Sequence, residues 1–251
     1  MSKISKILMI SVLAVFLAVG SVMAVPFNDN RPLTLGSSSE DSLQTVFNNT
    51  FGTNVIDAYN DQSTAALWTP AEAAVDSYLI TLLSAASGSL GIYSTTGSYA
   101  FDLGSDNAVS FNINDSGDLW VDGDEAIEGF GQVFGFCWAS ATGVTSYTED
   151  DKNAGGYGTD NNILALTYVV PDGASALLPE YQGGTTVNLQ GDNDWVLAFE
   201  DTIGGDGDFQ DAVFLIEDMQ PVPEPATMFL LGSGLIGLAG FGRKKFFNKA
   251  A

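Results

Sequence analysis

WVLAFEDTIGGDGDFQDAVFLI, residues 195–216, is the stretch of sequence that decides the fold of this chain. It begins and ends with apolar runs that are rich in aromatic and β-branched side chains, which favour strands. Between these runs, residues 200–211 are rich in Gly and Asp, the residue types that form turns and loops. We therefore predict two strands, at 194–200 and 211–217, with a loop between them.

The same alternation of short apolar runs and turn residues extends along the chain from Leu90 onward. Many short strands without helices between them are typical of antiparallel sandwiches. We therefore predict a mainly β fold, an antiparallel β-sandwich or jelly-roll-like domain over residues 25–221, with an exposed loop over 150–162. The further strands are predicted at 90–94, 99–103, 108–113, 118–121, 130–139, 162–170 and 185–189.

One or two helices are predicted before this β-rich part. The first covers residues from about 40 to 49, where Leu43, Val46 and Phe47 share one side of a helix. Ser39 is its candidate N-cap.

The second predicted helix has the stronger start signal. Thr69-Pro70-Ala71-Glu72 has the pattern of a capping box with proline at the first helical position. Apolar residues at helical spacing follow as far as Ala86, and Gly88 can end the helix.

The loop between the two deciding strands has the composition of a calcium site. Ca²⁺ takes six to eight oxygen ligands, and uncompensated carboxylates would repel one another. An EF-hand is excluded, because counting from Asp206 puts Asp211 at the position that requires glycine. Two interpretations stay open: a calcium site in a β-loop, or aspartates that cap turns and keep the loop solvated. The candidate metal ligands are Glu200, Asp201, Asp206, Asp208 and Asp211.

The overall composition excludes several classes of function. Nearly all of the 31 acidic residues lie between residues 25 and 221, where only Arg31 and Lys152 balance them. Nucleic acid is therefore not an expected partner. The chain has no histidine, which excludes Ser-His-Asp and Cys-His catalysis. Its one cysteine, Cys137, lies in an aromatic run and is expected to be a small buried apolar residue.

A second acidic cluster surrounds Trp120 and leaves three interpretations open. It can be another calcium loop, a pair of hairpin turns in a very acidic protein, or a carboxylate pair of a carbohydrate-active enzyme. In the last case the pair would be Asp122 with Glu125 or Glu128. The cluster consists of Asp115, Asp118, Asp122, Asp124, Glu125 and Glu128.

The first 24 residues have the order of a secretory signal peptide. Lys3 and Lys6 precede an apolar run over residues 7–19, and small residues end at Ala24. We predict a signal helix over 1–24 that signal peptidase removes after Ala24.

The other end, residues 222–251, has three parts. Pro223-Glu224-Pro225 comes first, because its prolines can continue neither a helix nor a central strand. An apolar, glycine-rich segment at 226–242 follows, and the basic residues Arg243, Lys244 and Lys245 come after it. A short apolar helix before a basic cluster is a stop-transfer arrangement, so we predict a marginal membrane helix over 226–242.

This end resembles the PEP-CTERM sorting signal of Gram-negative bacteria. The resemblance implies that an exosortase-type membrane protease processes the tail of a precursor anchored in the inner membrane. It further implies that the product reaches the cell surface or the extracellular matrix, where exopolysaccharide is an expected partner.

A second resemblance covers residues 45–220 and is carried mainly by the acidic loop. FED at 199–201, GGDGDFQD at 204–211 and the following strand are similar to the bacterial domain of unknown function 4114, as are LGIY at 90–93 and FGF at 134–136. Gln210 departs from the asparagine that is common in that loop. The resemblance implies a secreted β-rich domain with calcium binding and no established reaction. Together with the ends of the chain, it predicts a non-enzymatic, calcium-stabilised surface or biofilm-matrix protein.

Overall fold

The computed structural model describes one continuous β-rich domain with short gaps. The described residues are 41–72, 77–84, 86–103, 107–157, 162–178, 184, 186–189 and 193–222, without the side chains of 83 and 84. The predicted signal peptide at 1–24 and the predicted membrane helix at 226–242 lie outside them. Among the described residues, no helix is both long and apolar enough to span a bilayer.

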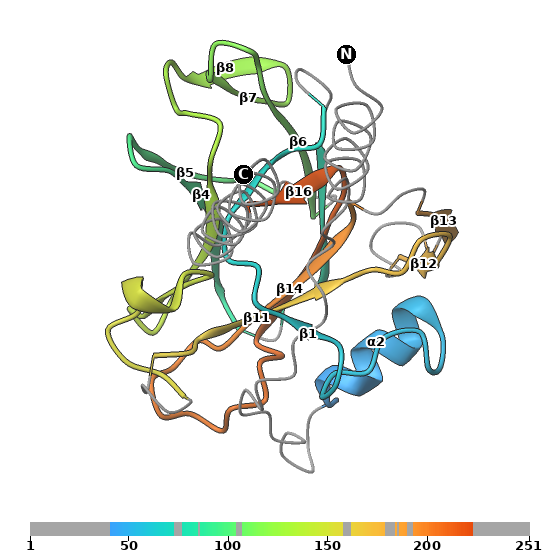
Figure 1. Ribbon diagram of the computed structural model, residues 1–251. Helices are drawn as coiled ribbons and strands as arrows, with labels where there is room; N and C mark the ends of the chain where they lie inside the picture. Colours follow the sequence, from blue (N-terminus) through green and yellow to red (C-terminus); the bar gives the residue numbers. More distant parts are fainter. Residues whose placement is uncertain are drawn as a thin grey trace, which may run out of the picture.

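The largest element of the fold is an eight-stranded antiparallel sheet with β14 and β15 near its centre (Figure 1). Its order across the sheet is β1 (Gln62–Ser63), β11 (Ala165–Val169), β14 (Trp195–Phe199), β15 (Ala212–Ile216), β3 (Ser77–Ser84), β6 (Ala108–Ile113), β7 (Leu119–Val121) and β8 (Asp124–Ile127). The two runs that decide the fold are therefore paired strands, as predicted.

A four-stranded antiparallel sheet is the second element. Its order is β10 (Thr145–Tyr147), β9 (Gly135–Ser140), β4 (Gly88–Tyr93) and β5 (Ser98–Ala100). Two strand pairs complete the described part, β12 (Ser175–Leu177) with β13 (Thr186–Asn188) and β16 (Met219–Pro221) with β2 (Trp68–Pro70), together with a 3₁₀ turn at Asp150–Lys152. This is the mainly β, antiparallel architecture that the sequence predicts.

The main hydrophobic core lies between the two sheets. Trp138 of β9 packs on Phe214 of β15 with ring centroids 5.6 Å apart, and Phe136 packs on Trp68 at 5.6 Å. Trp195 joins this cluster and donates its indole hydrogen bond to the carbonyl of Met219 at 2.9 Å. Two antiparallel sheets packed on a shared aromatic core fit the predicted sandwich.

A second core covers the other face of the large sheet. The helix α2 (Leu43–Phe51) packs there, with Phe47 against Tyr168 of β11 at 4.8 Å between ring centroids. Along β14, Trp195, Leu197 and Phe199 enter the main core, whereas Val196 and Ala198 enter the second. Burial on both faces explains why this strand is apolar without interruption.

The first predicted helix is confirmed, and it begins slightly later than expected. It covers Leu43–Phe51, and Ser42 is its N-cap, with a side chain that accepts a hydrogen bond from the amide of Thr45 at 3.3 Å. Leu43, Val46 and Phe47 are buried together, as their spacing predicts.

The second predicted helix, from Thr69 to Gly88, is wrong. Trp68–Pro70 form β2 and Ser77–Ser84 form β3, which pairs with both β15 and β6. Leu79 enters the main core while Ile80 and Leu82 enter the second. A strand buried on both faces has apolar residues at neighbouring positions, and this imitates helical spacing.

The loop predicted at residues 150–162 is only partly exposed. Gly155 and Gly156 are buried, and Tyr157 forms an isolated antiparallel bridge with Ile163. Each of the nine predicted strand segments contains a strand, but the sequence missed the short β1, β8, β10, β12 and β16.

The contact between the sheets gives a stability prediction. Phe214→Ala removes the ring that joins Trp138 to Phe199, and it should destabilise the protein by about 3–5 kcal/mol. Urea unfolding followed by tryptophan fluorescence measures this change. Tyr78→Ala is the matched control on the neighbouring strand, since Tyr78 is 48% exposed and should cost about 0.5 kcal/mol or less. Equal losses in both variants would contradict the assignment of this core.

Candidate metal site

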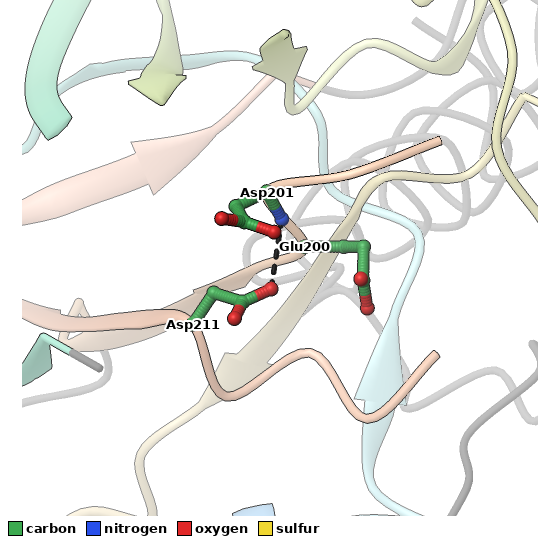
Figure 2. Close-up of side chains that lie close together, drawn as sticks. All are labelled: Glu200, Asp201 and Asp211. Carbon is green, nitrogen blue, oxygen red and sulfur yellow. Dashed lines mark hydrogen bonds between the residues drawn. The ribbon is translucent and has the colours of Figure 1, made fainter. Parts of the chain in front are cut away.

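The acidic loop leaves the large sheet at the end of its central hairpin. Phe199 and Ala212 are the last pair of β14 and β15, so Glu200 and Asp211 directly flank the loop. The amide of Asp201 donates a hydrogen bond to Oδ2 of Asp211 at 2.8 Å (Figure 2). The loop is therefore closed at its base, and its first and last carboxylates lie together.

Glu200 is shared by two groups of carboxylates. One ligand oxygen from each of Glu200, Asp201 and Asp211 lies within 4.8 Å of the others, and the same holds for Glu200, Asp206 and Asp208. Glu200 and Asp208 are buried, Asp201 and Asp211 are half-buried, and Asp206 is exposed. The structure thus brings all five predicted ligands together around one side chain.

The carboxylate of Glu200 is buried with an unsatisfied oxygen. Glu200 is 1% exposed, and its Oε2 has no hydrogen-bond partner. The amide of Phe209 donates a hydrogen bond to the same carboxylate, and the absence of a Cβ at Gly205 leaves the space that Oε1 occupies. Because a buried acceptor without a partner is costly, this oxygen points to a ligand that the loop is built to hold.

The electrostatics of the loop oppose its own charge. Burial, followed by the nearby charges of Asp211, Asp206 and Asp208, raises the pKa of Glu200 to about 8. Burial and neighbouring carboxylates likewise raise the pKa of Asp211 to about 6. These shifts mean that the empty loop holds protons where a cation would hold it charged.

Asp208 is oriented by the residue whose role the sequence leaves in doubt. Gln210 donates to Asp208 from its backbone amide at 3.3 Å and from its Nε2 at 3.0 Å. Gln210 is 2% exposed, and Phe209 between them has a positive φ of 55°. Gln210 therefore positions a carboxylate with its amide nitrogen, which is a different role from that of a ligand.

Tyr157 is a member of the site that the sequence analysis missed. Its hydroxyl is buried without a hydrogen-bond partner, and its ring packs on Phe209 at 5.7 Å between centroids. Burial, and then the charges of the carboxylates led by Glu200, raise its pKa to about 12. Gly207, with φ of +74°, leaves room for the ring. The two glycines before Tyr157 were the available signal, but they were interpreted as an exposed loop.

A second buried acidic group lies at the opposite end of the same hairpin and was also missed. Asp194, before β14, is 4% exposed, and burial raises its pKa to about 6. Glu217, after β15, has a pKa raised to about 7 by burial and then by Asp194 and Asp218. These residues do not belong to either group that could share a metal ion.

The acidic cluster around Trp120 does not form such a group among the described residues. Asp122, Glu125 and Glu128 are exposed. Asp122 accepts a hydrogen bond from the amide of Ser110 at 3.0 Å, and Asp118 accepts one from Gly129 at 2.8 Å. Trp120 is half-buried. This placement favours the interpretation as hairpin turns.

Cys137 is half-buried on β9, and burial raises its pKa to about 11. A thiol with a raised pKa is a poor nucleophile at neutral pH. The residues predicted for sorting and cleavage, Pro223 to Lys245 and Ala24, lie outside the described part of the chain.

Comparison with known proteins bears on the C-terminal end of the chain. Neither the search of curated proteins nor the search of solved structures gave a match. Residues 221–244 match the family model described as the PEP-CTERM protein-sorting motif, which contains Pro223, Glu224 and Pro225. The chain therefore carries, at its C-terminal end, the sorting motif of exported precursors that are anchored in the membrane and processed by exosortase.

Proposed function

We propose that this protein is a non-enzymatic component of the cell surface or extracellular matrix. Its β domain binds Ca²⁺ through the loop at 200–211 and associates with exopolysaccharide. The sorting motif at 221–244 supports export and processing by exosortase. The buried Glu200 carboxylate, with its unsatisfied Oε2 between two carboxylate groups, is the observation that carries the proposal.

The ligand set favours calcium over other metals. All five candidate ligands are carboxylates, and hard oxygen donors suit Ca²⁺, whereas zinc and copper sites use nitrogen or sulfur. Five carboxylates can supply the six to eight oxygens that Ca²⁺ takes, because each can bind through one or two. A flexible loop also suits Ca²⁺ better than Mg²⁺, which demands near-octahedral geometry.

The position of the site explains how calcium would stabilise the domain. Glu200 and Asp211 continue the two central strands, and the backbone of this segment is tied to its neighbours. The Glu200 amide donates to the Leu164 carbonyl at 3.0 Å, and the Ala86 amide donates to the Asp211 carbonyl at 3.0 Å. An ion bound here would relieve repulsion at a point where several strands meet.

The alternative function, a carbohydrate-active enzyme, has less support. Its carboxylate pair, Asp122 with Glu125 or Glu128, lies exposed at the β7–β8 edge of the large sheet. None of the three lines either of the two largest described grooves. The resemblance to the domain of unknown function 4114 supports the binding proposal, because its loop coincides with Glu200–Asp211.

Calcium should stabilise the purified protein strongly. Saturation at about 100 times Kd adds about 2.7 kcal/mol, which raises Tm by about 5–10 °C for a domain of this size. Differential scanning fluorimetry in EDTA and in millimolar Ca²⁺ measures the shift. Glu200→Gln should remove most of it, since the variant keeps the size of the side chain and loses the charge.

Glu217→Gln is the matched control for this experiment. Glu217 is another partly buried glutamate with a raised pKa, and it lies at the opposite end of the same hairpin. Its variant should keep the full calcium response. A calcium response that is absent in the native protein, or equal in the two variants, would defeat the calcium proposal.

The pKa shifts predict how the stability of the metal-free protein depends on pH. Folding raises the pKa of Asp211 and Asp194 to about 6, that of Glu217 to about 7 and that of Glu200 to about 8. The folded state therefore binds more protons than the unfolded state, and the free energy of unfolding falls as pH rises from about 4 to about 8. Urea unfolding in EDTA should give a loss of about 2 kcal/mol or more between pH 5 and pH 8.

Glu200→Gln should reduce this fall, most clearly between pH 7 and pH 8 where Glu200 titrates. Saturating calcium should reduce it as well. A metal-free protein that becomes more stable over the same pH range would contradict the assigned burial of these carboxylates.

The sorting motif predicts the fate of the precursor. Glu224→Ala, between the two prolines, should leave a full-length chain in the membrane fraction. Cell fractionation and immunoblotting measure the outcome in a host that has an exosortase. Glu72→Ala replaces an exposed glutamate outside the motif and should be processed normally. Normal release of the Glu224 variant would refute dependence on this residue.

A further inference from the structure

The outer face of the four-stranded sheet carries a groove of about 730 Å³. Leu90, Ile92, Phe136 and Trp138 point into the main core, so the alternate residues of β4 and β9 face outward. One row across the sheet consists of Tyr147, Cys137, Gly91 and Ala100, which are paired in register. Small side chains thus form the floor, between larger residues.

The floor is deep because of particular residues. A Cβ at Gly91 would lie 3.0 Å from the Tyr99 carbonyl oxygen and 3.1 Å from Sγ of Cys137. Ala139 and Ser89 form the next row with Thr145, and both are exposed. A volume of this size falls within the range of ligand-binding sites in proteins.

Tyrosine rings form one wall and are held in place. Tyr93 and Tyr147 pack edge to face at 5.3 Å, and Lys152 lies 5.3 Å from the centre of the Tyr93 ring. Tyr93 is buried against Gly135, where a Cβ would meet its hydroxyl, while Tyr147 is half-buried. The aromatic wall is therefore preorganised, which lowers the entropy cost of binding.

The turn over residues 94–97 forms the opposite wall and is also fixed. Ser94 donates its amide hydrogen bond to Gly97 inside the turn at 2.8 Å, in the sense Ser94 N–H to Gly97 carbonyl. Thr96 donates its hydroxyl to the carbonyl of Gly129 at 3.0 Å. Both walls of the groove thus have defined positions before any ligand binds.

The charge of the groove differs from that of the rest of the domain. No carboxylate lines it, although the chain carries 31 acidic residues. Lys152, the one lysine or arginine in the described part, lies at its rim and forms an ion pair with Glu149 at 3.6 Å. The groove is nearly neutral, and it offers hydroxyls from Ser89, Ser98 and Thr145.

We infer that this groove binds a segment of a neutral polysaccharide. A sugar ring offers an apolar face to Tyr147 and hydroxyls to the serines and threonine. A cationic ligand would find no carboxylate in the groove, and a polyanion would be repelled by the acidic domain. A purely apolar ligand would leave the hydroxyls without partners.

This inference rests on the proposed association with polysaccharide and adds the place and the ligand class. The test uses isothermal titration calorimetry of the purified protein with cellohexaose, laminarihexaose, maltohexaose and mannohexaose. Hexagalacturonate is the anionic comparison. Alkylation of Cys137 gives a second readout, because this thiol lies on the floor and a bound sugar should slow its modification.

At least one neutral hexasaccharide should bind and protect Cys137. Ala139→Trp fills the groove from an exposed position, and Tyr147→Ala removes the aromatic wall; each should weaken binding by about tenfold or more. Tyr78→Ala, an exposed tyrosine outside the groove, should change affinity less than about twofold. All three variants should keep the native calcium response, which shows that they are folded.

Four outcomes would overturn the inference. Binding that survives Ala139→Trp unchanged refutes the groove and leaves the association with polysaccharide standing. No binding of any hexasaccharide at 10 mM refutes both, while the calcium response tests the metal site separately. Tighter binding of hexagalacturonate refutes the neutral ligand. A dimer that Ala139→Trp dissociates, without sugar binding, assigns the groove to a second copy of the chain.

Discussion

The burial of β14 and β15 on both faces is the constraint on which the rest of the structure depends. All ten of their residues are buried, and they alternate between the two cores. The loop that joins them starts and ends at fixed points, so Glu200 and Asp211 cannot separate to reduce their repulsion. The charge that the loop collects must therefore be neutralised where it lies, by protons or by a cation.

Local patterns in the sequence predicted the strands well because turn residues separate them clearly. The same patterns failed from Thr69 to Gly88, where Ile80 and Leu79 serve different cores and imitate a helix. The five acidic ligands were found because they are close in sequence. Tyr157 and the tyrosine-walled groove were missed, since they depend on the pairing of distant segments, which no local pattern records.

Export and the acidic loop fit one physical sequence of events. A precursor with the sorting motif leaves the cytoplasm before its domain needs calcium, and extracellular calcium modules work at weak, millimolar affinities. A loop that is strained without its ion and relieved with it makes the stability of the domain depend on the compartment. The groove lies on the four-stranded sheet, separate from this loop, so binding of a glycan and binding of an ion use different surfaces.

The exposed carboxylates of β8 have a consequence for the colloidal behaviour of a secreted protein. β8 is the last strand of the large sheet, and Asp124 and Glu125 lie exposed along it. A free strand edge can recruit a strand from another molecule, and charges on that edge make such an addition unfavourable. At the other edge, β1 is only two residues long. The acidic cluster around Trp120 thus helps a sheet-rich protein to remain dispersed in a crowded layer outside the cell.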